Sequence, residues 1–533
     1  MILFLLNYPK FGYMMLKKLF DSLNIVSAFK VMGSTSEKKA VLRSLAATQL
    51  LVQISTIPVA LTIPTVKDFF ETDLITASWT VIIRLLILSS TVLLFARLGQ
   101  KHGYAPIFIG GAILITVASG LAAVSPDIYF LILFNGFIGL GAAMITATAN
   151  PILTATFAPN ERGKAYSIPI IAARVGTLMG MIAFGPLLEF SSWRFVFLTG
   201  LPIGLWCLWN VRGLVKFDYL KPDKSKTVSI NYFAAFLFSS MIIALVVSLN
   251  ASGWFRNASS GINTLWSDLS NGVDLASMNL QIPIILCFIG LTICFIIFQR
   301  NDETPFFRFS YFKERPGFSM AVFSDFVFHM SMMSTVVLIP ILVQEGRGYG
   351  PLVASWVLVP GQSLGLFVPI LAGFIFDKND PPWLRPGSLL LIVLGIGSLA
   401  IFSNMVPVWG IALLLMIAFL GTHAFQAASN ANVMNNLEED SAFASGTLEM
   451  DRQLGHTIGS TISATVMALA LPAASVLEKL RLESLTEYQN IYREGFSTAT
   501  SIVIFTMLSG AIVAGIQSGL FKSLRAGTLR KLP

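Results

Sequence analysis

Residues 128–150 read IYFLILFNGFIGLGAAMITATAN, a continuous stretch without a charged side chain. An α-helix rises about 1.5 Å per residue and the hydrocarbon core of a bilayer is about 30 Å thick, so a stretch of this length predicts a membrane-spanning helix. Thirteen further stretches along the 533 residues are similarly long and mostly apolar, although several contain charged residues. The predicted spans are 43–66, 74–96, 105–124, 128–150, 164–187, 193–212, 230–250, 281–299, 318–343, 352–376, 387–405, 407–430, 444–470 and 498–520.

The composition excludes both a soluble protein and a disordered one. Hydrophobic residues make up 55% of the chain and charged residues only 12%, whereas a soluble domain carries about 25% charged residues. Chains that remain disordered are rich in charge and poor in apolar residues. We therefore predict an all-α membrane protein that crosses the bilayer many times.

Several classes of site are excluded as well. Cys207, Cys287 and Cys294 each lie within an apolar run, so neither a disulfide framework nor a zinc site is predicted. The net charge of +8 forms no basic stripe, which excludes nucleic acid as a partner. No nucleotide-binding fingerprint precedes a strand, so we expect neither ATP hydrolysis nor a cofactor, and no metal.

Basic residues orient the predicted spans, whose even number places both termini on one side. If that side is the cytoplasm, 26 of the 36 lysines and arginines fall in cytoplasmic segments, 7 in outer segments and 3 within spans. Cytoplasmic loops carry the excess of lysine and arginine, so both termini are predicted to be cytoplasmic. Met1–Phe20 is interpreted as an interfacial segment, or as sequence upstream of a start at Met32.

Two groups of six spans repeat each other weakly. Gly139-Leu-Gly141 in the fourth span matches Phe419-Leu-Gly421 in the twelfth, about 282 residues later, and Ala149-Asn150-Pro151 matches Ala431-Asn432-Val433. Parallel repeats of this kind form the two halves of many secondary transporters. The predicted divisions are a cytoplasmic or interfacial segment (1–42), a six-helix half (43–212), a linker with two inserted helices (213–316), a second six-helix half (317–520) and a basic cytoplasmic tail (521–533).

Short motifs follow one another in a characteristic order along both halves. They are Thr62-Ile63-Pro64-Thr65-Val66, Ala77-Ser78-Trp79, Gly136-Phe-Ile-Gly139-Leu-Gly141-Ala142-Ala143, Asn160-Glu161-Arg162-Gly163-Lys164-Ala165, Ser192-Trp193-Arg194-Phe195-Val196-Phe197, Leu201-Pro202-Ile203-Gly204, residues 344–351 (QEGRGYGP), Ala444-Ser445-Gly446 and Arg452-Gln453-Leu454-Gly455. Over roughly residues 45–465 this ordered set resembles the major facilitator superfamily, specifically its fourteen-helix drug:proton antiporter branch. The resemblance implies the major facilitator fold and transport by alternating access, and it allows for a periplasmic adaptor protein as a partner.

The sequence departs from that branch at positions that matter for coupling. Ser55 stands where the branch has an acidic residue in its first helix, and Asn135 stands at the arginine of the fourth. Arg84 replaces a tyrosine of the second helix, and the loop at 96–104 has Gln100 in place of its aspartate. Residues 180–185 lack the usual Gly-Pro-x-x-Gly-Gly pattern. The resemblance therefore implies the fold, while proton-coupled drug export stays open.

A charged residue costs about 2.5–3.5 kcal/mol to insert at the bilayer centre, so such residues are rare within spans and typically serve a function. The charged residues deep within the predicted spans are therefore the candidate functional residues. Arg84 and Arg174 lie about midway along the second and fifth spans. They are predicted either to line a cavity that attracts an anionic group or to form structural pairs inside the bundle. The polar candidates beside them are Asn135, Gln53, Gln362 and His423, of which His423 is equally well explained as a packed core histidine.

Asp325 and His329 are four residues apart in the ninth span and share one helix face. The pair is predicted to bind and release a proton, to counter a cavity arginine, or to hydrogen-bond locally. In the thirteenth span Glu449, Arg452 and His456 also share a face, with Asp451 pointing elsewhere, and they are interpreted as a charge network that joins the halves, with a proton relay as the alternative. The other residues assigned to gating are Asp377, Gln100 and Lys101.

The predicted function is secondary active transport of an amphipathic small molecule, as proton-coupled export. The alternative within transport is a carrier of organic anions or lipid-like solutes that uses Arg84 and Arg174. The alternative of another class is a transport-inactive membrane receptor or scaffold. An enzyme is not expected, because the sequence shows no clustered nucleophile or metal site. The expected location is the bacterial inner membrane, and the expected partners are the lipid bilayer, a small-molecule substrate and protons.

Overall fold

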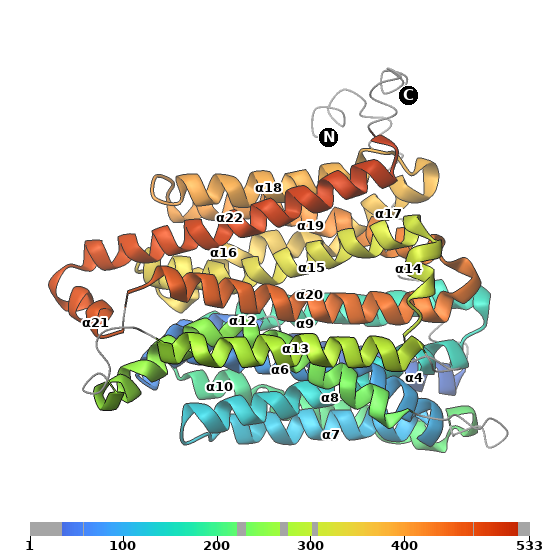
Figure 1. Cartoon of the computed structure of the whole chain (residues 1–533). Coiled ribbons are helices and arrows are strands. Elements are labelled where there is room, and N and C mark those ends of the chain that lie inside the picture. Colours follow the sequence, from blue (N-terminus) through green and yellow to red (C-terminus); the bar gives the residue numbers. More distant parts are fainter. Residues whose placement is uncertain are drawn as a thin grey trace.

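The computed structural model describes residues 35–56, 58–220, 231–266, 275–300, 307–472 and 474–520, and all regular elements within them are helices. Figure 1 shows the long helices running side by side along one direction. The predicted interfacial segment before residue 35 and the tail after residue 520 lie outside the described residues.

The first six predicted spans correspond to one group of helices. They are α4 (Ser36–Ile54) with η1 (Pro58–Thr62) and α5 (Ile63–Phe69), α6 (Leu74–His102), α7 (Tyr104–Ala123), α8 (Ile128–Thr156), α9 (Pro159–Phe190), and α10 (Trp193–Leu198) with α11 (Gly200–Val211). The first span is therefore broken, not continuous over 43–66. Pro58 has no backbone N–H to continue α4, so the chain goes on as the 3₁₀ turn η1 before α5 begins.

The remaining predicted spans also become helices. They are α12 (Tyr232–Trp266), α13 (Leu275–Arg300), α15 (Pro316–Ile341) with η4 (Leu342–Gly346), α16 (Pro351–Ser363) with α17 (Val368–Asn379), α18 (Leu384–Phe402), α19 (Val408–Asn435), α20 (Ser441–Ala470) and α22 (Leu485–Gln517), with the short helices α14 (Ser310–Glu314) and α21 (Ala474–Glu483). Helix α22 begins at Leu485, well before the predicted start at 498. The prediction missed its first turns because they carry too many polar residues to resemble a membrane span.

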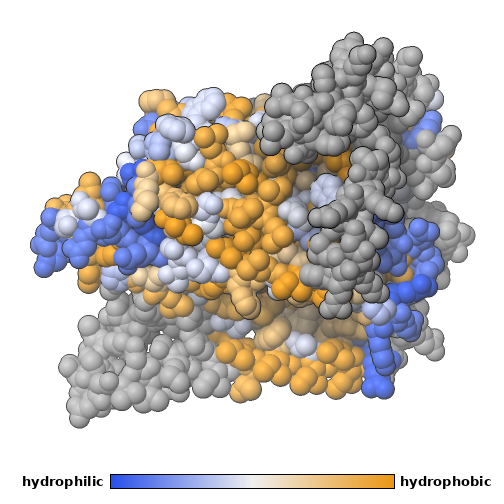
Figure 2. Space-filling view, turned by 90° about the horizontal axis from the view of Figure 1, so that it is seen from above, coloured by the Kyte–Doolittle hydropathy of each residue, from blue (hydrophilic) through white to orange (hydrophobic). Residues whose placement is uncertain are grey.

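Thirteen helices in the described residues are long and apolar enough to cross a membrane. The exception among the predicted spans is α20, which carries Glu449, Asp451 and Arg452 together with many hydroxyl side chains. It nevertheless packs against α15 on one side and α6 on the other, and Figure 1 shows it within the bundle. We propose α20 as the fourteenth span. The face seen in Figure 2 is hydrophobic across its middle and hydrophilic towards both ends, as helices in a bilayer require.

The short links predicted after the first and third spans are stabilised by aspartates. Asp73 accepts hydrogen bonds from the backbone of Ile75 and Thr76 at the start of α6, at 2.9 and 3.0 Å. Asp127 does the same for the first turn of α8, at 2.8 and 3.0 Å. Such caps satisfy N–H groups that a helix start leaves without partners.

The packing repeats between the two groups of six spans. In the first group α4 packs on α9, α8 on α6 and α7, and α11 on α4 and α7. In the second group α15 packs on α20, α19 on α18 and on α16 with α17, and α22 on α15 and α18. This repetition supports the two six-helix halves expected from the sequence, which we call the first and second halves.

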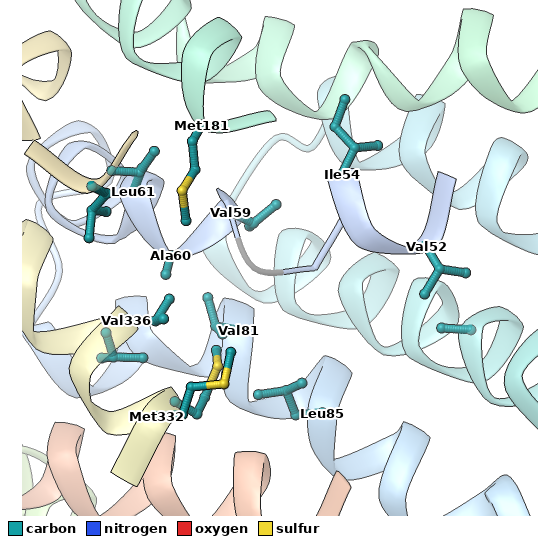
Figure 3. Packing of buried hydrophobic residues seen from close by; sticks show 14 of the residues in the cluster. Val52, Ile54, Val59, Ala60, Leu61, Val81, Leu85, Met181, Met332 and Val336 are labelled. Atoms are coloured by element: carbon teal, nitrogen blue, oxygen red, sulfur yellow. The ribbon is translucent and has the colours of Figure 1, made fainter. Parts of the chain in front are cut away.

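Two helix pairs form the most extensive contacts between the halves. They are α6 with α20, where Thr457 donates to Ser89 at 3.2 Å, and α9 with α16. The hairpin of α12 and α13 packs along α6 and α20, so it covers one of these two seams. Figure 3 shows the apolar contact at the middle of the interface, where Val59, Leu61 and Val81 of the first half meet Met332 and Val336 of α15.

Candidate functional site

A cluster of charged side chains connects the halves at the end of the bundle where α5 and η4 lie. The Lys67 ammonium group on α5 lies 2.5 Å from a carboxylate oxygen of Glu345 on η4, and both side chains are largely buried. The Tyr488 hydroxyl on α22 donates to the other oxygen of Glu345 at 2.5 Å. Arg481 on α21 lies 3.1 Å from Asp68, which follows Lys67. This Lys67–Glu345 cluster holds α5 of the first half against three elements of the second.

Replacing Lys67 by methionine is expected to let the two halves separate at this end of the bundle. The Glu345 carboxylate would be left buried without its cation, which typically costs about 3–5 kcal/mol and disfavours the closed arrangement. Position 355 is suited to detect this separation. Ser355 is fully buried, and its hydroxyl donates a hydrogen bond to the Met181 carbonyl across the interface, so a reagent reaches this position only when the halves separate. In a variant without the native cysteines, a cysteine at Ser355 should react with a membrane-impermeant maleimide at least tenfold faster after Lys67→Met.

The control for this prediction is Lys479→Met. Lys479 lies on α21 at the same end, but its side chain is 70% exposed and 3.9 Å from Glu483 of its own helix. An exposed pair contributes little, so the labelling rate should stay at its unmodified value. Equal labelling of Lys67→Met and the unmodified chain would contradict a closing role for the cluster.

Helix α15 is the centre of the second half and positions the predicted pair Asp325 and His329. Every residue from Val327 to Ile341 is buried. Such burial follows from close contact with α20, where Gly455 and Gly459 are four residues apart on one face. A Cβ on Gly455 would lie 2.8 Å from that of His329, and one on Gly459 would overlap the Met330 carbonyl group. Small residues at this spacing let two membrane helices approach closely.

This approach brings acidic and imidazole groups of the two helices together. His329 Nε2 lies 3.5 Å from Asp325 Oδ2 within α15, and both side chains are fully buried. His329 Nδ1 lies 3.2 Å from Nε2 of His456 on α20. The carboxyl group of Asp451, also on α20, interacts with that of Asp325. The structure thus joins His456 to the predicted Asp325–His329 pair and adds Asp451.

Arginines from both halves face this group. Arg452 on α20 lies 3.0 Å from Glu449 one turn away and also interacts with Asp325. Arg174 on α9 donates a hydrogen bond to the Gln426 side chain on α19, so it reaches from the first half into the second. The two guanidinium groups interact with each other as like charges. Two charged groups of equal sign therefore meet at the interface of the halves.

Arg84 lies apart from these groups, inside the first half. Its side chain is 1% exposed, and its guanidinium donates to Oδ1 of Asn135 on α8. Asn135 in turn donates to the Leu131 carbonyl group at 2.8 Å. Nε and Nη1 of Arg84 have no hydrogen-bond partner among the described residues. The structure thus brings together two of the positions at which the sequence departs from its branch.

The other predicted residues lie in different places. Gln53 on α4 is half-buried, while His423 on α19 and Gln362 on α16 are buried with ring or amide nitrogens that lack hydrogen-bond partners among the described atoms. His423 stacks on Phe419 of its own helix. Gln100 and Lys101 are exposed at the end of α6, where the Lys101 ammonium lies 3.2 Å from the Tyr232 hydroxyl. Asp377 belongs to α17, and its side chain lies outside what the structure describes.

Sequence reasoning missed several partners in these clusters. Asp451 and Gln426 were not assigned roles, although both are polar residues within apolar spans. Lys67 and Glu345 were treated as parts of loops. Nothing in the sequence pairs these residues, because each contact joins helices far apart in the chain. Among the described residues no three His, Cys, Asp or Glu side chains form a group that could hold a metal ion.

Comparison with known proteins identifies the family. The family profile described as the Major Facilitator Superfamily matches residues 45–460, most of the chain. The chain belongs to the Major Facilitator Superfamily. The family and fold expected from the motifs are thereby confirmed. Together with the thirteen apolar helices, this makes it a multi-pass bacterial membrane protein of a transporter family.

Its curated relatives are transporters. The chain is 22% identical to the riboflavin transporter RibZ of Clostridioides difficile, over 76% of this chain and 83% of that protein. It is 23% identical to a multidrug resistance protein B homolog of Mycobacterium tuberculosis (79% and 74%) and 26% identical to multidrug resistance protein 3 of Bacillus subtilis (70% and 69%).

Solved structures of superfamily transporters share the fold. A bacterial homolog of the human lysosomal transporter Spinster, in an inward-facing and unoccupied conformation, has a TM-score of 0.61 at 14% identity, over 91% of this chain and 98% of that one. The peptide transporter POT in complex with sulfate also has a TM-score of 0.61, at 12% identity over 90% and 95%. At these identities the likeness concerns the fold alone.

Proposed function

We propose that this superfamily member exports amphipathic small molecules in exchange for protons, by alternating access between its two halves. The observation that carries the proposal is Asp325: a fully buried carboxyl group on the central helix of the second half, beside which the described residues place the Ser429 hydroxyl and the carboxyl group of Asp451. Carboxyl groups at such depth in a membrane protein typically mark proton pathways. The relatives named for multidrug resistance and efflux support the export of small molecules.

The surrounding charges connect protonation to movement of the halves. While Asp325 is ionised, its negative charge offsets the repulsion between Arg452 on α20 and Arg174 on α9. When a proton neutralises Asp325, less negative charge opposes that repulsion across the interface of the halves. The hydrogen bond from Arg174 to Gln426 then becomes less favourable, and α9 can separate from α19. The sequence predicts cytoplasmic termini; in that orientation, the Lys67–Glu345 cluster closes the outer end of the protein.

This proposal is tested in everted membrane vesicles with an imposed proton gradient. Lipophilic cations such as tetraphenylphosphonium are added and proton efflux is followed with a pH-sensitive dye. We expect cation-stimulated efflux from the unmodified chain and at least a tenfold loss for Asp325→Asn, because an amide cannot carry the proton. Unchanged efflux in that variant would contradict the assignment of Asp325.

Arg84 favours a second candidate function, transport of organic anions. A fully buried guanidinium that meets only an amide in the described structure has unused donors and uncompensated charge, which suits a carboxylate or phosphate group. The riboflavin transporter among the relatives makes a larger polar solute conceivable as cargo. Efflux or uptake that responds only to anions, and is lost in Arg84→Gln while Asp325→Asn retains it, would favour this candidate. A folded protein that responds to neither group of solutes would contradict both.

A further inference from the structure

The register between α15 and α20 places two carboxyl groups at the same level. His329 and Met330 contact Gly455 and Gly459 at successive turns. One turn earlier on each helix stand Asp325 and Asp451, four residues before His329 and Gly455. Their carboxyl groups interact directly, and the side chains are 0% and 5% exposed. The crossing of the helices therefore brings these two acids together in a buried site.

Few groups are available to satisfy two negative charges there. Among the described residues, Oδ2 of Asp451 has no hydrogen-bond donor, and Asp325 has the Ser429 hydroxyl as a donor. Helix α20 presents Arg452 and His456, α19 presents Ser429, and α9 presents Arg174, which acts on His329. From α22 the neighbours are uncharged: Thr506 meets Ser331, and the Gly510 carbonyl lies 3.5 Å from the Ser324 hydroxyl.

A proton held between the two acids resolves this conflict. One carboxylic acid then donates its O–H to the carboxylate of the other, which adds a donor inside the site and removes the like-charge repulsion. The remaining single negative charge faces Arg452. Leaving both carboxylates ionised would instead keep two like charges side by side in a buried site, which is costly.

We propose that Asp325 and Asp451 form one proton-carrying unit, in which a single proton from the water on one side of the membrane binds between the two carboxyl groups and is released to the other side. This inference rests on the proton coupling proposed above and adds the second carboxyl group. The two acids are expected to act as one unit and not additively, because neither can hold the shared proton alone.

The test uses purified full-length protein in lightly buffered detergent solution. Tetraphenylphosphonium is added and released protons are counted with a pH indicator for the unmodified chain, Asp325→Asn, Asp451→Asn and the double variant. We expect about one proton per chain from the unmodified protein, and at least a tenfold loss in all three variants, with the double no worse than either single. Asp451→Glu should restore release, because it returns a carboxyl group. Glu37→Gln, which removes an exposed acid at the start of α4, should release normally.

A second measurement does not depend on the added cation. In infrared difference spectra, the unmodified chain should show the carbonyl band of one buried protonated carboxylic acid near neutral pH. Each single variant should lose this band, because its one remaining acid is then ionised. That carboxylate accepts a hydrogen bond from the introduced amide and faces Arg452. A band that persists in both single variants would overturn the shared proton.

The outcomes separate this inference from the proposed function. Loss of proton release in Asp325→Asn with normal release in Asp451→Asn would overturn the shared site and leave Asp325 as the carrier. Normal release in both variants would overturn both proposals. Loss in Asp451→Asn without rescue by Asp451→Glu would assign Asp451 a packing role and contradict the shared site.

Discussion

Replacement of Gly459 by valine is expected to leave only a small fraction of the protein folded. Its Cβ would overlap the carbonyl group of Met330, a backbone atom that cannot turn aside as a side chain can. Extra methyl groups in a packed core cost about 1–3 kcal/mol, and more where backbone must shift. Since α15 is the central helix of the second half, displacing it disturbs the whole half. Size-exclusion chromatography and thermal unfolding in detergent would measure the loss.

The same helix provides a matched control. For Gly446 on α20, the described part of the chain places no atom within 4 Å of the position that a Cβ would take. Gly446→Val therefore carries the same cost in helix propensity without the steric overlap, and it should retain a near-normal yield and melting temperature. If both variants lose folded protein equally, the effect comes from valine in the helix and not from the crossing with α15.

The second large effect is expected for Arg84→Leu, which should stabilise the protein while abolishing any transport that uses the arginine. A charged residue at the bilayer centre costs about 2.5–3.5 kcal/mol, and Arg84 has only an amide as a partner among the described residues. Leucine removes that cost but leaves Oδ1 of Asn135 without its donor, at about 1–3 kcal/mol. The net gain is on the order of 1 kcal/mol, seen as a higher melting temperature.

Arg97→Leu is the control for this prediction. Arg97 lies near the C-terminal end of the same helix, α6, and is partly exposed, so removing its charge should give no gain in stability. Adding Asn135→Leu to Arg84→Leu should raise the melting temperature further, because the orphaned amide oxygen is then removed as well. A melting temperature that falls in Arg84→Leu would show that Arg84 is a structural residue.

The prediction of helices from the sequence succeeded where the pattern is local. The spans and the short links between them follow from runs of apolar residues, and the structure adds that Asp73 and Asp127 cap the helices that follow two of these links. The break after α4 and the early start of α22 were missed. A proline near the end of an apolar run does not show how the chain continues, and polar turns such as those after Leu485 resemble a loop until their packing partners are known.

The candidate residues were found because a charge inside an apolar span is conspicuous. Their partners were not found, since lipid is as apolar as leucine and a span's sequence does not show which face it turns inward. Asp451 illustrates the point: helical spacing places it away from Glu449 and Arg452, and only the position of α15 shows that it points to Asp325.

The sequence by itself determined the membrane class, the helical segments, the family and the charged residues buried in it, because hydrophobicity, capping and motif order depend on neighbours along the chain. Only the tertiary structure decided which of those charges meet. The closing contact of Lys67 with Glu345, the amide partner of Arg84 and the joining of Asp325 with Asp451 each depend on how two helices cross. Such a crossing is set by small residues such as Gly455 and Gly459 together with the surface they fit, and that surface belongs to another part of the chain.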